Sequence, residues 1–320
     1  MTLKLTQWWM LIGLALALGL SACTPTATPT VQWIGVSDTP QPTAIPPTMT
    51  PTPILEGMPS PTHSPQSVQN TPTEASALIT PTPLGCWENG GYLTEDAIST
   101  TALELPLEFR IYLPPCYYHQ PDRYFPVLYL FHGLYSTDIQ WVRMGVVETA
   151  NSLMGTGEIP PFIIVMPRDS DWSLPPENKF GEMIITEFIP WIDGHYRTIP
   201  GNDFRAIGGL SRGGNWAINL GLRHWGMFGS IGAHSAPIFY TDGLQLSRWL
   251  DNIPSEKMPR FFLDIGEKDG DGEYLHQFEE MLSERGIPHE WHLNSGTHNE
   301  KYWSAHLEQY LRWYSEPWQE

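Results

Sequence analysis

Basic residues and cysteines are scarce in this sequence. Its 320 residues include 17 Lys and Arg against 35 Asp and Glu, which gives a formal net charge of -18, and no basic run occurs. Phosphate groups are bound by clustered Lys and Arg, so this charge balance argues against a nucleic-acid partner. The 3 cysteines form no Cys-x-x-Cys pair and no combination with histidine that predicts a zinc site. We therefore expect neither a metal nor a cofactor.

Lys and Arg are entirely absent from Thr24 to Leu84, where Thr, Pro, Ser and Ala dominate. This segment has too few apolar residues to offset the entropy lost on ordering, which predicts a disordered linker over residues 23–84. The remaining residues, 85–320, are enough for one domain with a single core. The sequence therefore predicts one folded domain that follows a long linker.

Long apolar runs are missing except near the start of the chain, where "WWMLIGLALALGL" follows Lys4. A run of about 13 residues is typical of a signal peptide and is short for a transmembrane helix. The run ends at Leu20-Ser21-Ala22-Cys23, which resembles the lipobox of bacterial lipoproteins. The resemblance implies a signal peptide over residues 1–22, a lipidated Cys23 and an exported protein anchored on the extracytoplasmic face of the membrane. A plain secretory signal is the alternative, because small residues also precede its cleavage site.

The two remaining cysteines are Cys86 and Cys116. If Cys23 carries lipid, they form an even pair in an oxidising compartment, which favours a disulfide. Such a bridge would close a loop of about 30 residues and stabilise the fold by roughly 3–4 kcal/mol in the chain-entropy model. Two buried free thiols are the alternative.

From Leu105 onward, short apolar runs alternate with segments that have apolar residues three or four apart. This alternation predicts an open, mostly parallel α/β sheet with helices on both faces. Ligands of such sheets bind beyond the carboxyl ends of the strands, in the loops that follow them. The expected strands are "LEFRIYLP", "FPVLYLFHG", "PFIIVMP", "FRAIGG", "GSIGAHS", "RFFLDIG" and "HEWHLN".

One of these loops contains Ser211 between Gly209 and Gly213, in the pattern Gly-x-Ser-x-Gly. The expected strand "FRAIGG" precedes it, and a helix is expected to begin near Gly213. A Gly-x-Ser-x-Gly turn between strand and helix is typical of a nucleophile elbow, which exposes the serine. The alternative is a glycine turn whose serine caps the helix.

A nucleophilic serine needs a base to remove its proton and a third group to orient that base. His298 follows a glycine in the turn between the last expected strand and the last helix, where the base is expected. The acid is Asp269 in the loop after "RFFLDIG", with Asp271 as the alternative. Glu267, Asp269 and Asp271 also mimic the start of a calcium loop, but the twelfth position counted from Glu267 is Phe278 instead of a glutamate, which argues against calcium.

Four separated motifs, "FPVLYLFHG", "GGLSRGGNWA", "FLDIGEKDG" and "GTHNEKYWSAHLEQYL", occur in an order that resembles an esterase family of α/β-hydrolases. This family includes esterase D, feruloyl esterase modules, enterochelin esterases and mycolyltransferases. The resemblance covers roughly Leu105 to Tyr314. It implies the α/β-hydrolase fold, with Ser211 as nucleophile, Asp269 as acid and His298 as base.

The same resemblance implies an oxyanion hole formed by the backbone N–H groups of Leu134 and Arg212. We expect the Arg212 side chain to be solvated or to meet an acidic group on a substrate. Four tryptophans near the candidate loops either pack in the core or form a platform for a sugar or an aromatic acyl group: Trp141, Trp172, Trp216 and Trp303.

These expectations describe an extracytoplasmic serine esterase that hydrolyses carboxylic esters through an acyl-enzyme. Its substrates would be small-molecule, polysaccharide or lipid esters, and its contact with the membrane would be through Cys23. An acyltransferase with the same machinery is one alternative. A binding lipoprotein that has kept the fold without the reaction is the other.

Overall fold

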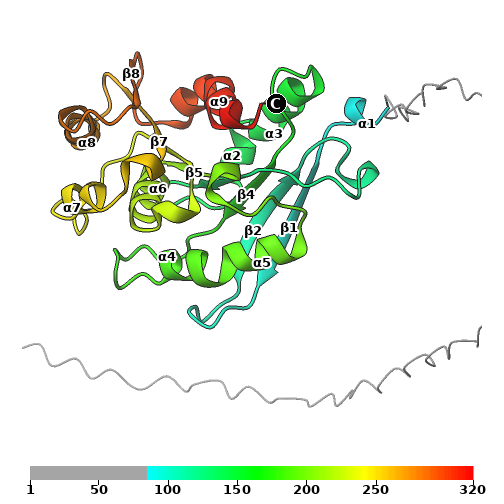
Figure 1. Cartoon of the computed structure of the whole chain (residues 1–320), viewed down its shortest axis with the longest axis horizontal. Coiled ribbons are helices and arrows are strands. Elements are labelled where there is room, and N and C mark those ends of the chain that lie inside the picture. Colours follow the sequence, from blue (N-terminus) through cyan, green and yellow to red (C-terminus); the bar gives the residue numbers. More distant parts are fainter. Residues whose placement is uncertain (1–84, 320) are drawn as a thin grey trace, which may run out of the picture. The chain divides into compact units, whose positions relative to one another are not determined.

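The computed structural model describes residues 85–319, which form an α/β domain built on an eight-stranded sheet (Figure 1). The predicted signal peptide, the linker and Cys23 lie outside the described residues. In space the strands run in the order β1-β2-β4-β3-β5-β6-β7-β8. β2 is antiparallel to both its neighbours, and all other adjacent pairs are parallel. The predicted mostly parallel sheet is confirmed.

The elements alternate along the chain as the apolar pattern predicted. The strands are β1 (Tyr92–Ile98), β2 (Leu107–Leu113), β3 (Val127–Phe131), β4 (Ile163–Pro167), β5 (Arg205–Leu210), β6 (Ser230–His234), β7 (Arg260–Gly266) and β8 (Glu290–Asn294). The helices are α1 (Gly85–Glu88), α2 (Gln140–Arg143), α3 (Val146–Gly155), α4 (Phe180–Met183), α5 (Ile189–His195), α6 (Arg212–Arg223), α7 (Leu246–Asp251), α8 (Gly272–Glu284) and α9 (Glu300–Ser315).

Helices cover both faces of the sheet, because the central strands alternate apolar side chains between two cores. In β3, Val127, Tyr129 and Phe131 join the core formed with α4 to α8, while Leu128 and Leu130 join the core formed with α2, α3 and α9. Figure 1 shows α2, α3 and α9 above the sheet and α4 and α5 below it. Strands buried on both faces have the continuous apolar runs seen in the sequence.

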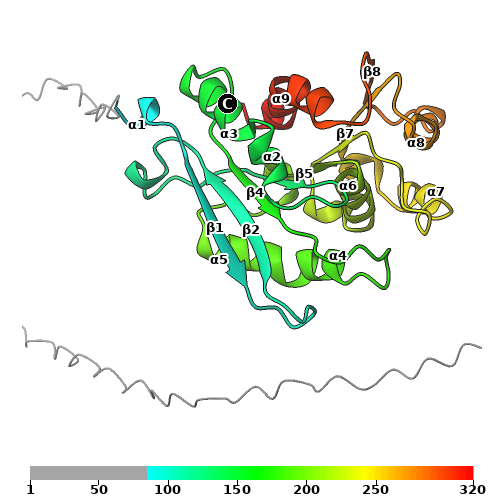
Figure 2. The ribbon, with the colours of Figure 1, turned by 180° about the vertical axis from the view of Figure 1, so that it is seen from behind.

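The edge strand β1 was not predicted. All its residues except Ile98 are exposed, so its sequence, "YLTEDAI", lacks the alternation that indicates a half-buried strand. It pairs along its whole length with β2, at the edge of the sheet remote from β8 (Figure 2). Backbone hydrogen bonds to β2, which a sequence pattern does not reveal, therefore define this strand.

A disulfide joins Cys86 of α1 to Cys116 in the loop after β2, with 5.1 Å between their Cα atoms. It ties the beginning of the described chain to the sheet. Within residues 85–319, no helix is both long enough and apolar enough to span a bilayer.

Candidate active site

Ser211 lies in the sharp turn between β5 and α6, with φ 52° and ψ −123°. A positive φ is strained for a non-glycine residue, and the strain holds the side chain exposed above the sheet. The flanking glycines allow this turn to form. A Cβ on Gly209 would collide with the backbone of Gly213, and a Cβ on Gly213 would collide with the carbonyl of Phe131. These contacts leave no room for a side chain at either position, so the Gly-x-Ser-x-Gly spacing is required by packing.

His298 reaches the same place from the loop between β8 and α9. Its Nε2 lies 2.9 Å from Ser211 Oγ, and its Nδ1 lies 2.9 Å and 3.1 Å from the two carboxylate oxygens of Asp269. Asp269 follows β7, so the three side chains come from loops after β5, β7 and β8. The structure thus forms an uninterrupted hydrogen-bonded series from carboxylate to imidazole to hydroxyl.

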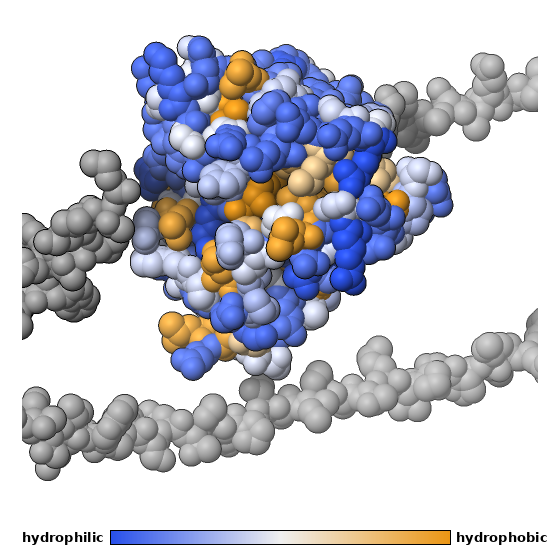
Figure 3. Space-filling model, turned by 90° about the vertical axis from the view of Figure 1, so that its left-hand side faces the viewer, coloured by the Kyte–Doolittle hydropathy of each residue, from blue (hydrophilic) through white to orange (hydrophobic). Residues whose placement is uncertain are grey.

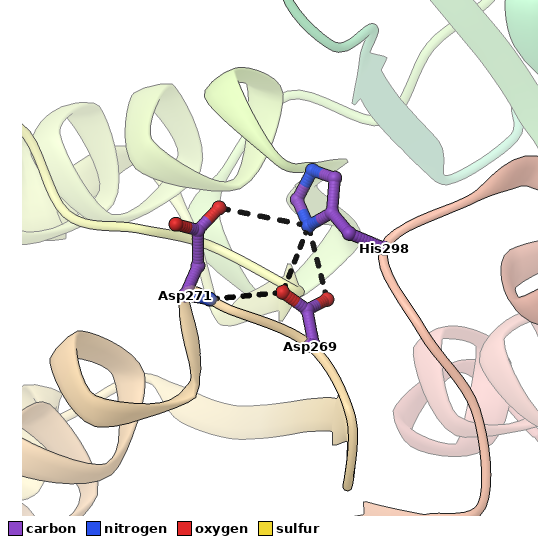
Figure 4. A group of neighbouring side chains, drawn as sticks. All are labelled: Asp269, Asp271 and His298. Atoms are coloured by element: carbon purple, nitrogen blue, oxygen red, sulfur yellow. Dashed lines mark hydrogen bonds and ion pairs between the residues drawn. The ribbon is translucent and has the colours of Figure 1, made fainter.

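The second aspartate of this loop, Asp271, also faces His298 (Figure 4). Its carboxylate oxygen lies 3.6 Å from His298 Nδ1, beyond hydrogen-bond range, and its side chain is 37% exposed, whereas that of Asp269 is 0% exposed. The backbone N–H of Asp271 donates to Asp269 at 3.0 Å. The geometry therefore places Asp269 as the orienting partner and Asp271 as a neighbouring charge. One ligand atom from each of these three side chains lies within 4.8 Å of the others, so the group could also hold a cation.

The surroundings shift the pKa values of Asp269 and His298 towards a charged pair. Burial acts to raise the pKa of the Asp269 carboxyl, but hydrogen bonds from His298, the Asp271 amide and Ser235 outweigh it and lower the pKa. The hydrogen bond to Asp269 raises the pKa of the His298 imidazole against the effect of its partial burial, and the charges of both aspartates add to the rise. The imidazolium that forms when His298 accepts a proton is thereby stabilised.

Ser235 and Trp303 contact each other and the side chains of Asp269 and His298. The Ser235 hydroxyl hydrogen-bonds Asp269 and accepts a hydrogen bond from Trp303 Nε1 at 3.1 Å. The Trp303 ring also meets the His298 ring edge-on, with 5.1 Å between centroids. Ser235 is fully buried and has a φ of 53°. The sequence contains no motif that pointed to Ser235.

The loop after β3 passes directly beside Ser211, since a Cβ on Gly133 would lie 3.5 Å from Ser211 Cβ. The Gly133 N–H is already bonded to the Gln140 side chain at 2.8 Å, so the next amide, that of Leu134, is the one this loop can offer to a substrate. Arg212 is the first residue of α6, and the first N–H groups of a helix have no partner within it. The backbone can therefore supply two donors beside Ser211.

The expectation that the Arg212 side chain is solvated or meets a substrate acid is wrong. The residue is 6% exposed, and its Nε pairs with Asp169 at 3.0 Å. Trp216 Nε1 donates to the same carboxylate at 2.9 Å. The Asp169 amide donates to His132 Nε2 at 2.9 Å, and burial lowers the pKa of His132. The buried charges of Arg212 and Asp169 thus neutralise each other behind the site.

Among the four tryptophans near the expected loops, three pack in the core and one faces solvent. Trp141, Trp216 and Trp303 are at most 4% exposed, whereas Trp172 is 55% exposed. His234, the last residue of β6, is fully buried with its Nδ1 2.6 Å from Asp264 Oδ1.

Comparisons with known proteins agree with this geometry. The family model described as "Putative esterase" matches residues 100–314. An esterase of Mycobacterium tuberculosis strain H37Rv is 26% identical over 238 residues, which covers 58% of this chain and 51% of that protein. A protein of Xylanibacter ruminicola named endo-1,4-beta-xylanase/feruloyl esterase is 29% identical over 191 residues, covering 56% of this chain and 24% of that protein. The match therefore spans about half or less of these relatives.

Solved structures show the same fold. A ferulic acid esterase has a TM-score of 0.65 at 26% identity, covering 72% of this chain and 99% of that chain. The feruloyl esterase module of Clostridium thermocellum complexed with sinapinate has a TM-score of 0.61 at 17% identity, covering 79% of this chain and 96% of that chain. The fold is that of the α/β-hydrolases. Because the family model covers more than half of the sequence, the chain belongs to this esterase family.

Proposed function

We propose that this protein hydrolyses carboxylic esters through an acyl-enzyme. The Ser211 hydroxyl gives its proton to His298 Nε2 as Oγ attacks the ester carbonyl carbon. The tetrahedral intermediate collapses, the C–O bond to the alcohol breaks, and His298 returns the proton to the leaving oxygen. Water then attacks the acyl-enzyme with His298 again as base, which releases the acid and restores Ser211.

Asp269 holds the imidazole in the tautomer with Nε2 free to accept the proton, and it stabilises the imidazolium that forms. The backbone N–H groups of Leu134 and Arg212 would bind the oxyanion of the intermediate, a role worth about 3–4 kcal/mol for each donor. The observation that carries the proposal is the series Asp269 to His298 to Ser211, with Oγ 2.9 Å from Nε2 on a strained elbow.

We further propose that the enzyme acts outside the cytoplasm, anchored through lipidated Cys23. The lipobox-like Leu20-Ser21-Ala22-Cys23 supports this, and so does the disulfide between Cys86 and Cys116, because such bonds persist in oxidising compartments. Relatives named as feruloyl esterases support esters of aromatic acids, free or on polysaccharides, as a substrate class.

The test uses the purified protein and a fluorophosphonate probe that labels activated serines, alongside a short p-nitrophenyl ester. We expect turnover and stoichiometric labelling in the wild type, and loss of both in Ser211→Ala. Ser255→Ala is the matched control, because it removes an exposed hydroxyl in the loop before β7, whereas the site lies in the loops that follow the strands, so Ser211 should still be labelled. An unlabelled Ser211 in folded wild-type protein contradicts the proposal.

A further inference from the structure

Two exposed aromatic side chains lie together on neighbouring loops of the site. Tyr135, in the loop after β3, is 75% exposed, and Trp172, in the loop after β4, is 55% exposed. Their rings meet edge to face, with 4.8 Å between centroids and 85° between planes. Leu134 and Leu174, beside them in the chain, are 41% and 38% exposed. Aromatic and apolar surface gathered in this way is typical of binding sites.

This aromatic pair adjoins the nucleophile. Tyr135 is two residues after Gly133, which passes beside Ser211, and it directly follows Leu134, the proposed oxyanion donor. Figure 3 shows the side of the molecule on which the loop before α4 lies in Figure 1, with apolar residues in the middle of that face and others near its margins. Tyr135 therefore belongs to the loop that passes beside Ser211, and the Trp172 ring meets it there.

Two buried side chains hydrogen-bond the backbone on either side of Trp172. The Arg212 guanidinium donates to the carbonyls of Asp171 at 3.0 Å and Ser173 at 2.7 Å, on either side of Trp172. Asn178, which is 4% exposed, donates to the Asp171 carbonyl as well. The residue next to the nucleophile thus positions the exposed tryptophan through its side chain.

The backbone of Tyr135 is also held, in a strained conformation. Its φ is 60°, a strained value that is uncommon for a bulky residue. Strained residues of this kind cluster at ligand-binding positions, where the surrounding structure fixes them. The surrounding structure therefore fixes the backbone on both sides of the aromatic pair.

We propose that Tyr135 and Trp172 form an aromatic ledge that binds a ring of the ester substrate through its flat apolar face, and that Arg212 positions this ledge. The inference rests on the proposed esterase function. The ring carries no negative charge, because the charge of Arg212 is already neutralised by Asp169 and the exposed side chain of Asp171 would repel an anion. Both the aryl ring of an aromatic acyl group and the pyranose ring of a sugar alcohol have this flat apolar face.

The experiment measures kcat and KM for three esters with the whole chain: methyl cinnamate, which carries an aryl ring on the acyl side, acetylated xylobiose, which carries sugar rings on the alcohol side, and ethyl acetate, which has no ring. We expect Trp172→Ala and Tyr135→Ala to lower kcat/KM for one ring-bearing ester about three- to tenfold more than for ethyl acetate, mainly through KM. The ester that is affected identifies the source of the ring.

The chain offers a matched control in the exposed edge-to-face pair Tyr92 and Tyr118, whose centroids are 4.9 Å apart on the edge strand and the loop after β2. Tyr118→Ala should change no ratio between esters. Arg212→Lys keeps the charge but loses the planar fork that bridges two carbonyls, so it should raise KM for the same ring-bearing ester.

Equal losses on all three esters, or no loss, in both Trp172→Ala and Tyr135→Ala would overturn the ledge while leaving the esterase intact. A wild-type protein that hydrolyses none of the three esters but is labelled at Ser211 overturns the ledge alone, and one that is also unlabelled overturns the proposed function and the ledge with it.

Discussion

Ser211 Oγ lies 2.9 Å from His298 Nε2, although 87 residues separate the two in the chain. Ser211 follows β5 and His298 lies in the loop after β8, with β6 and β7 between these strands in the sheet. Parallel strands end on the same edge of a sheet, so the loops after them converge there. Residues far apart in sequence can therefore form one hydrogen-bonded unit.

The two aspartates beside His298 should contribute very unequally to catalysis. Asp269→Asn loses the carboxylate that holds the imidazole tautomer, so we expect kcat to fall by about 10⁴-fold, as for orienting aspartates in other triads. Asp271→Asn removes only a charge 3.6 Å away, and we expect less than about a tenfold loss. Steady-state kinetics of the two variants measure this. Equal losses, or a larger loss in Asp271→Asn, would assign the acid to Asp271.

The pH dependence of kcat/KM should report the titration of His298. Only the neutral imidazole accepts a proton from Ser211, so activity should fall as the pH drops through the pKa of His298. The hydrogen bond to Asp269 raises that pKa, which places the midpoint above the ordinary value of about 6.5. Asp271→Asn removes one negative charge that raises the pKa, so its acid limb should move to lower pH. A profile that is flat between about pH 5 and 8 contradicts the role of His298 as base.

Ser235 should affect the catalytic rate through its hydrogen bond to Asp269. Its hydroxyl is one of the groups that lower the pKa of the Asp269 carboxyl, and hydrogen bonds to charged groups are worth about 1.5–3 kcal/mol. We expect Ser235→Ala to lower kcat about tenfold with little change in KM. Ser235→Gly removes the same hydroxyl but relieves the strain of φ 53°, so it should lower kcat equally and be the more stable variant. Unchanged kcat in both variants would show that Asp269 does not depend on Ser235.

The disulfide should stabilise the domain without affecting the reaction. Replacing Cys86 and Cys116 together by serine should lower the free energy of unfolding by roughly 3–4 kcal/mol, because the open loop gains entropy in the unfolded chain. Urea unfolding of the double variant measures this, with the wild type in reducing agent as a second measure. Because the bridge joins α1 to the loop after β2, whereas the site residues lie in the loops after β3, β5, β7 and β8, kcat/KM should not change. An unfolding midpoint equal to that of the oxidised wild type would contradict the prediction.

Much of the fold could be predicted from the sequence, because the central strands and the long helices are buried and burial leaves a pattern of apolar residues. β3 and β4 are fully buried and appear as continuous apolar runs, and Gly209 and Gly213 mark the turn around Ser211. The edge strand β1 was missed because nearly all of it is exposed and backbone pairing alone defines it.

In the candidate site, too, some residues could be predicted from the sequence and others only from the structure. The sequence by itself determined Ser211 and its glycines, because a tight turn restricts which residues can occupy it, and it placed Asp269 and His298 in loops of the right order. Only the tertiary structure decided between Asp269 and Asp271, since that choice depends on distances across two loops. It also decided the partner of Arg212, which is buried against Asp169, 43 residues away. Pairing between distant loops depends on how the sheet brings them together, and no local pattern records it.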